Sequence, residues 1–454
     1  MILRATLGRL AKASATPLYC ARVVTAAASA GSLAIMTHLL GTEQFGTYAL
    51  VVTTAGFVKQ VFDARSQDII TRYLPQAIVN RNGASARRTI GVSLGVEVLV
   101  IALAAGCLIA FGAGIAGIVL HATTKSAIIA MGGLLVLATL GASTSRGILV
   151  VNDRFMAIGI ADALTAIVIL IGSVCVAKMT PSVTAFIYVA VLGALTATAF
   201  ISVAAWRTVR SLLRGCELQS ADIRLGDVCR FAFGANVLGT IRLLQSSGPT
   251  LLLGSLLSTQ SAGIYYFALR IAGYLNSALS PLLVVARARI SNWAASPITM
   301  TRDLLARTVG TLALLCALAT VGMMAGGANL IALLFGEAYR ASFQPTLVAL
   351  VGTAIGVTVT PIGYFVLVRG SIVVNNLIYL AATFAQYAIL ILLVYRAGAL
   401  GASVALLVYY SVVAALLAIY AKRLVDGRAH TTLSEMGAEL GHRGERSSSL
   451  RESL

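Results

Sequence analysis

Charged residues are scarce in this sequence. Only 11% of its 454 residues are charged, whereas 58% are hydrophobic. Soluble domains carry about 25% charged residues, and a chain this apolar could not cover a water-exposed surface with polar groups. The scarcity excludes an ordinary soluble protein and indicates that lipid surrounds most of the chain.

Residues that build metal and catalytic sites are also sparse. The six cysteines are scattered without a CxxC, and the four histidines lie far apart, so we expect no metal site. The sequence contains no GxxxxGK[ST], HExxH or GxSxG motif. The loops are too short for a separate catalytic domain. We therefore expect no catalytic residues, no bound cofactor and no enzymatic activity.

Long apolar runs fill most of the chain. A helix needs about 20 residues to cross the hydrocarbon layer of a membrane, and the runs lack the strict alternation of a transmembrane β-barrel. We predict an all-α polytopic membrane protein with about 12 transmembrane helices. The predicted spans are 17–39, 46–63, 89–112, 126–148, 155–177 and 183–205, then 231–257, 262–285, 306–326, 345–368, 371–395 and 401–421.

The spans divide into two sets of six, and polar segments lie before, between and after them. Residues 1–16 form a basic, amphipathic lead-in to a first six-helix bundle at 17–205. A cytoplasmic connector at 206–230 leads to a second bundle at 231–421. The polar tail at 422–454 is predicted to be disordered.

Basic residues alternate between the two sides of these spans. If the N-terminus is cytoplasmic, 26 of the 34 Lys and Arg residues lie on the cytoplasmic side and four on the other. Short loops rich in Lys and Arg stay inside the cell. We therefore predict that both termini are cytoplasmic. The net charge of +18 reflects these loops and the anionic lipid beside them, and we expect no nucleic-acid partner.

The two halves share a short repeat at an offset of 217 residues. The segment LLGTEQFGTY at 39–48 aligns with LLSTQSAGIY at 256–265, and the matched positions include Gly46 with Gly263 and Tyr48 with Tyr265. Six spans per half make the repeats parallel, and transporters built in this way bind substrate between the halves. The tyrosines predict an aromatic belt at the membrane surface or, alternatively, stacking against sugars.

Three stretches carry a family resemblance. HLLGTEQFGTYALV at 38–51, DARSQDIITRYLP at 63–75 and LLLGSLLSTQSAGIYYFALRI at 251–271 resemble polysaccharide flippases of the Wzx type. Those proteins belong to the MOP superfamily, with MATE exporters and lipid II flippases. The resemblance implies a MATE-like fold and transport of undecaprenyl-pyrophosphate-linked O-antigen or exopolysaccharide repeat units across the bacterial inner membrane. Its implied partners are that lipid-linked glycan, membrane lipids and the polymerase and chain-length proteins of polysaccharide assembly.

The chain departs from the family at one point. An acidic residue often precedes the LLLG turn of the seventh span, whereas residues 245–250 here read QSSGPT. An ion-coupling role of that acid does not transfer to this chain, and coupling to H⁺ or Na⁺ is left open.

Arg146 and Arg307 lie at the ends of predicted spans and are counted with the cytoplasmic loops. Four cations remain inside the spans: Arg22, Lys59, Arg242 and Arg270. A charge at the bilayer centre costs about 2.5–3.5 kcal/mol on insertion scales, so such residues are candidates for function. Arginine and lysine bind phosphate, and we predict that these four, with Asn236, form a pyrophosphate and sugar cavity. The alternatives are that Arg22 snorkels to the surface and that Lys59 pairs with Asp63.

Two further sets of charges have candidate roles. Arg65 and Arg72 lie at the inner mouth and are predicted to guide an anionic headgroup. Glu97 and Asp162 are the acids buried within spans, away from their ends, and they are candidates for ion coupling. The alternative for both acids is a pairing with a neighbouring arginine.

Other functions fit the sequence less well. A MATE-like multidrug exporter of cationic drugs would present acids to its substrate, whereas the charges within these spans are mainly cationic. A membrane-embedded glycan polymerase or ligase would have a large outer loop with Arg or His. Lipid II flippases carry extra spans. A purely structural member of a glycan-assembly complex is the remaining alternative.

Overall fold

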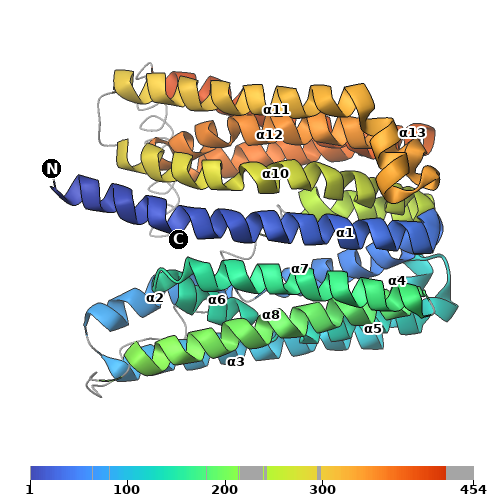
Figure 1. Cartoon of the computed structure of the whole chain (residues 1–454), viewed down its shortest axis with the longest axis horizontal. Helices are drawn as coiled ribbons and strands as arrows, with labels where there is room; N and C mark the ends of the chain where they lie inside the picture. The colour runs from blue at the N-terminus through green and yellow to red at the C-terminus, as the bar shows by residue number, and fades with distance from the viewer. Residues whose placement is uncertain are drawn as a thin grey trace, which may run out of the picture.

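The computed structural model describes residues 2–63, 65–80, 82–179, 181–212, 214, 239, 243–293 and 298–425, with the side chains of 2–20 and of a few residues in 281–304 left aside. Helices run lengthwise through the described chain and form two bundles side by side (Figure 1). The first bundle contains α1 Ile2–Val61, α2 Ser66–Val79, α3 Gly83–Ala110, α4 Gly112–Val119, α5 Ser126–Leu137, α6 Ala142–Val151, α7 Phe155–Lys178 and α8 Val183–Leu212.

The second bundle follows the same design. It contains a helical stretch at 243–256 and then four long helices. These are α10 Thr259–Trp293, α11 Ile298–Phe335, α12 Phe343–Arg369 and α13 Ile372–Val425; the short 3₁₀ turns η1 Thr123–Lys125 and η2 Glu337–Ser342 lie between helices.

Glycine turns divide two of these helices into two spans each. Gly41 interrupts α1 with φ 65° and ψ −175°, and Gly398 interrupts α13 with φ 49° and ψ −123°. A residue with a Cβ rarely adopts such angles. With these breaks, each of the predicted spans is helical over most of the part that the structure describes, which confirms the all-α polytopic prediction. Residues 2–16 are helical and continue directly into the first span.

The two ends of the molecule differ in what they contain. We call the end where α1 begins and α13 finishes the terminal end, and the opposite end, which holds the turns at Gly41 and Gly398, the far end (Figure 1). Exposed apolar side chains such as Leu99, Leu103 and Ile171 cover the outside between the two ends. Because lipid surrounds such a surface, every backbone group must be paired internally, as it is in these helices.

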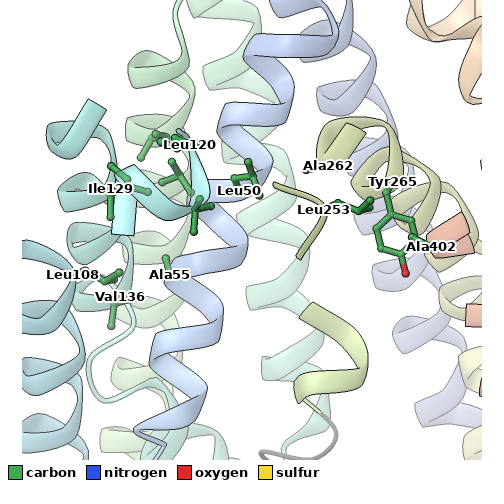
Figure 2. Close-up of a cluster of buried hydrophobic side chains, with 14 of the residues drawn as sticks. Leu50, Ala55, Leu108, Leu120, Ile129, Val136, Leu253, Ala262, Tyr265 and Ala402 are labelled. Atoms are coloured by element: carbon green, nitrogen blue, oxygen red, sulfur yellow. The ribbon is translucent and has the colours of Figure 1, made fainter. Parts of the chain in front are cut away.

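The far end is closed by contacts between the two bundles. Leu50 of α1 lies between first-bundle residues such as Ile129 and the second-bundle residues Leu253 and Ala262, all of them buried in one apolar cluster (Figure 2). The hydroxyl of Tyr339 donates a hydrogen bond to the Gly41 carbonyl at 3.1 Å. A ring nitrogen of His121 lies 3.0 Å from the Gly254 carbonyl oxygen.

The repeated glycines form the centre of this closure. A Cβ added to Gly46 would collide with the Thr259 carbonyl, and one added to Gly263 would lie 2.7 Å from the Gly46 Cα and 2.9 Å from the Thr42 carbonyl oxygen. Thr42 and Thr259 are themselves separated by the repeat offset of 217. The contact is therefore reciprocal, as expected for two similar halves related by a two-fold axis.

The tyrosines of the repeat do not form an aromatic belt. Tyr265 is fully buried and Tyr266 is 9% exposed. Phe45 packs against Tyr48 and Tyr266 with ring centroids 6.3 and 6.0 Å apart. The belt prediction was wrong for Tyr265, because its side chain points into the second bundle, toward Ala402 of α13 (Figure 2), and not toward the lipid.

Candidate functional site

A cavity of about 570 Å³ lies mainly within the first bundle and reaches the second bundle at one residue, Arg270 of α10. Its volume is typical of small-molecule sites, which range over about 300–1,000 Å³. The wall is formed by α1, α6, α7, α8 and the turn before α6. The lining residues are Arg22, Thr25, Ser29, Lys59, Thr139, Ala142, Ser143, Arg146, Asp162, Thr165, Ala166, Ile169, Ala194, Ala197, Thr198, Ile201 and Arg270.

Helix geometry places the cavity between mid-membrane and the terminal end. Arg22 precedes the Gly41 turn by 19 residues and Lys59 follows it by 18. At a rise of 1.5 Å per residue, each lies about 27–29 Å from the far-end turn. Arg270 is 11 residues into α10, or about 17 Å from the far end. The closed far end thus separates the cavity from that side.

Positive charge dominates the cavity. Among the described residues, its lining contains one acid, Asp162, and four cations, Arg22, Lys59, Arg146 and Arg270. The remaining polar lining consists of hydroxyl groups, including those of Thr25 and Ser143, which can donate hydrogen bonds to an anion. Such a lining attracts anions and repels cations.

Asp162 holds two of the arginines. Its Oδ1 lies 2.8 Å from Nη2 of Arg146, and its Oδ2 lies 3.5 Å from Nη1 of Arg22. One carboxylate therefore joins α1, α6 and α7 at the cavity wall. This pairing agrees with the alternative that Asp162 pairs with a neighbouring arginine. It also shows that Arg22 contacts a carboxylate of the protein.

Arg270 has a different support. Tyr266, one helical turn earlier on α10, accepts hydrogen bonds from Nε of Arg270 at 3.0 Å and from its Nη2. The guanidinium carbon also lies 4.9 Å from the centroid of the tyrosine ring. A hydroxyl and an aromatic face orient this cation without neutralising it, so its charge is available to a ligand.

Glu97 of α3 lies behind the cavity wall and is 3% exposed. Its Oε1 accepts a hydrogen bond from the Ser143 amide at 2.9 Å, and its Oε2 accepts bonds from the Thr144 amide at 2.9 Å and hydroxyl at 2.5 Å. These amides belong to the first turn of α6, where backbone N–H groups lack helical partners. Glu97 therefore caps α6, the helix that carries Arg146 into the cavity.

The α6 helix begins inside the predicted fourth span. That span is interrupted between the end of α5 at Leu137 and the start of α6 at Ala142, where Gly141 has φ 81°. A helix broken at membrane depth requires partners for its free backbone groups, and Glu97 supplies them.

Two predicted inner-mouth residues lie near the terminal end. Arg65 follows α1 in a left-handed conformation (φ 51°), and its Nε is 3.7 Å from Oδ2 of Asp63. Its guanidinium lies directly against Gly239 of the second half. Asp63 therefore pairs with Arg65, whereas Lys59 lines the cavity. Arg72 is exposed on α2.

The structure brings together Arg22, Lys59 and Arg270 from the predicted cavity set. Arg242 and Asn236 fall outside the described residues. The sequence reasoning missed Arg146, which it counted among the basic loop residues, and Tyr266. A spacing signal existed for Tyr266, which precedes Arg270 by four residues on one helix face.

Comparison with known proteins places this architecture. The chain matches the family model described as "Polysaccharide biosynthesis protein" over residues 35–344. No curated protein matches it. Among solved structures, it is similar to an inward-facing multidrug resistance MATE family transporter of the MOP superfamily, with TM-score 0.65, 12% identity, and coverage of 91% of this chain and 99% of that one.

Two other solved structures resemble this chain over a similar share of its length. The lipid II flippase MurJ in an inward closed conformation gives TM-score 0.66 and 11% identity, covering 90% of this chain and 91% of that one. A MOP superfamily transporter from Pyrococcus furiosus gives TM-score 0.57 and 13% identity, covering 91% and 95%. These likenesses show a shared fold, and the match over residues 35–344 shows that the chain belongs to the polysaccharide biosynthesis protein family of multi-pass membrane proteins.

Proposed function

We propose that the protein is a flippase that moves undecaprenyl-pyrophosphate-linked oligosaccharide repeat units across the bacterial inner membrane for polysaccharide export. The observation that carries this proposal is the cavity with four cations and one acid. A diphosphate diester is negatively charged on both phosphates, and arginine binds phosphate oxygens through two parallel hydrogen bonds. The family supports a role in polysaccharide biosynthesis.

The charge of the cavity disfavours the second candidate, a multidrug exporter. A cationic drug would be repelled by Arg22, Lys59, Arg146 and Arg270, with only Asp162 to attract it. A membrane-embedded polymerase or ligase is disfavoured by the short connections at the far end, such as the turns at Gly41 and Gly398.

We infer that the described conformation opens toward the cytoplasm. The bundles touch closely at the far end, and the cavity lies on the terminal side of that contact. The excess of Lys and Arg near the terminal end supports a cytoplasmic placement of both termini. Alternating access would then require the far-end contact to open while the bundles close at the terminal end.

We further propose that an H⁺ or Na⁺ gradient drives the cycle, and the contacts favour Asp162 over Glu97 as the coupling group. Asp162 lines the cavity, where its partners can change as substrate enters. Glu97 is occupied by three hydrogen bonds at the start of α6.

The test is polymer export in a strain that depends on this protein. Arg22→Ala, Arg270→Ala and, from the sequence prediction, Arg242→Ala should each reduce export at least tenfold at an unchanged protein level. Lipid-linked oligosaccharide should accumulate on the cytoplasmic leaflet. Arg340→Ala is the matched control, because Arg340 is exposed at the far end and pairs only with the exposed Glu337. Near-normal export from all three cavity variants would reject the proposal.

A further inference from the structure

The only acid among the residues that line the cavity occupies a position suited to a phosphate. Asp162 contacts Arg146 and Arg22 through different oxygens, at 2.8 and 3.5 Å. The arginines come from different helices, α6 and α1, and a group with two anionic oxygens between them can contact both. Carboxylates and phosphates present similar pairs of oxygens to a guanidinium.

The arginine pair also needs an anion when the cavity is empty. Two like charges in a partly buried site repel each other strongly, because the local dielectric constant is lower than that of water. Asp162 offsets this repulsion and holds both side chains. Lys59 and Arg270 line the same cavity without a carboxylate among the ion pairs of the described residues.

We propose that Asp162 is a built-in competitor of the substrate phosphate and sets the preference of the cavity for diphosphate over monophosphate. This inference rests on the proposed anionic substrate. A ligand must displace the carboxylate to reach Arg22 and Arg146. One phosphate would replace only what Asp162 already provides, whereas a second phosphate gains contacts with Lys59 or Arg270. The return of Asp162 to its arginines then favours release of the substrate.

The test uses the purified full chain in lipid nanodiscs and two probes, inorganic pyrophosphate and inorganic phosphate, measured by titration calorimetry. The natural protein should bind pyrophosphate at least tenfold more tightly than phosphate. Asp162→Asn keeps the shape of the side chain and removes its charge, so phosphate should bind at least tenfold more tightly than to the natural protein, and the preference should shrink.

Asp153→Asn is the matched control. Asp153 is exposed in the turn before α7 and has φ 54°, a conformation that asparagine tolerates well. Asp153→Asn makes the same chemical change outside the cavity and should leave the affinities for pyrophosphate and for phosphate unchanged.

A second measurement does not depend on the folding of a variant. With isotope-labelled aspartate in the natural protein, infrared difference spectra should show a shifted carboxylate stretch when pyrophosphate binds, and Asp153→Asn should retain that shift. Pyrophosphate binding without any aspartate signal, or an Asp162→Asn protein with unchanged phosphate affinity, would overturn the competitor role and leave the flippase proposal intact. If the natural protein binds neither anion, both the competitor role of Asp162 and the proposal of an anionic substrate fail.

Discussion

The two halves of the chain meet through a symmetrical contact but have dissimilar interiors. At the far end, Gly46 faces the Thr259 carbonyl and Gly263 faces the Thr42 carbonyl, so each half makes the same contact with the other. The sequence repeat at an offset of 217 residues therefore corresponds to a real structural relation. Backbone packed on backbone leaves no space there for side chains.

The charges do not follow this symmetry. The first half supplies Arg22, Lys59, Arg146 and Asp162 to the cavity, and the described second half supplies Arg270 alone. The acids in the described part of the second half, Asp303 and Glu337, are both exposed.

Near the LLLG turn, the contacts that the structure describes in the second half are polar and uncharged. Gln386 donates a hydrogen bond to the Gln245 carbonyl at 3.4 Å, and Tyr387 donates one to the Leu244 carbonyl at 2.9 Å. The acid that the family resemblance implies before this turn is absent from residues 245–250. The two halves thus share the contact that closes the far end, and under the proposed function the described groups for substrate recognition are concentrated in the first half.

The largest effect should follow from breaking the symmetrical contact. Gly46→Ala and Gly263→Ala each place a methyl group against backbone atoms that cannot rotate away, and overpacking of this kind costs about 1–3 kcal/mol. The far end should open, so that an impermeant thiol reagent applied from that side reaches a cysteine introduced at Ser29 in a cysteine-free protein.

The controls for this prediction lie on the same two helices. Gly56 of α1 and Gly273 of α10 have no atom within 4 Å of an added Cβ. Gly56→Ala and Gly273→Ala should leave labelling unchanged and stabilise the helices slightly, by about 0.5–1 kcal/mol. Equal labelling in all four variants would show that the glycine crossing does not close the far end.

A smaller effect should follow from weakening the charged interior of the first half. Glu97→Gln retains one oxygen acceptor for the three donors of Ser143 and Thr144, so at least one buried amide loses its partner. Unsatisfied buried donors cost about 1–3 kcal/mol each, and chemical denaturation in detergent should show a loss of this size. Glu337→Gln, an exposed carboxylate in a surface pair, should change stability little. A loss no larger than that of Glu337→Gln would contradict the capping role.

The sequence predicted the fold well because lipid imposes simple rules on it. Continuous apolar runs of sufficient length must be helices. The sequence showed Gly46 and Gly263 only as matched positions of a repeat, and the structure identified them as the contact between the halves. The interruption of the fourth span at 138–141 was not predictable, because its ATLG sequence is apolar and contains no proline. Its stability depends on Glu97, a tertiary partner 46 residues from Ser143 in sequence.

Part of the site was also predictable, because a charge inside an apolar run is easy to recognise in a sequence. Arg22, Lys59 and Arg270 stood out as charges within apolar runs. Arg146 lies near the predicted end of a span, where a loop cation is the ordinary interpretation. Only the break in the span and the contact with Asp162 place it in the cavity. The prediction of an aromatic belt failed for Tyr265 because the sequence alone cannot distinguish a lipid-facing tyrosine from one that packs inside its own bundle.

The smallest effect concerns Arg270, the cation that the described second half supplies to the cavity. Tyr266→Phe keeps the aromatic ring that lies 4.9 Å from the Arg270 guanidinium and removes the hydroxyl that accepts its hydrogen bonds. Arg270 should become less well oriented but remain charged, so export should fall a few-fold at an unchanged protein level.

A double-mutant comparison distinguishes this positioning role from a general defect in packing. In an Arg270→Lys background, chosen to retain the charge without the fork of a guanidinium, Tyr266→Phe should have a clearly smaller effect than it has alone. Tyr188→Phe on the exposed face of α8 should leave export unchanged in both backgrounds. If Tyr266→Phe lowers export equally with Arg and Lys at position 270, the hydroxyl acts on the bundle contact and not through the cation, and the second half would contribute less to recognition than the cavity suggests.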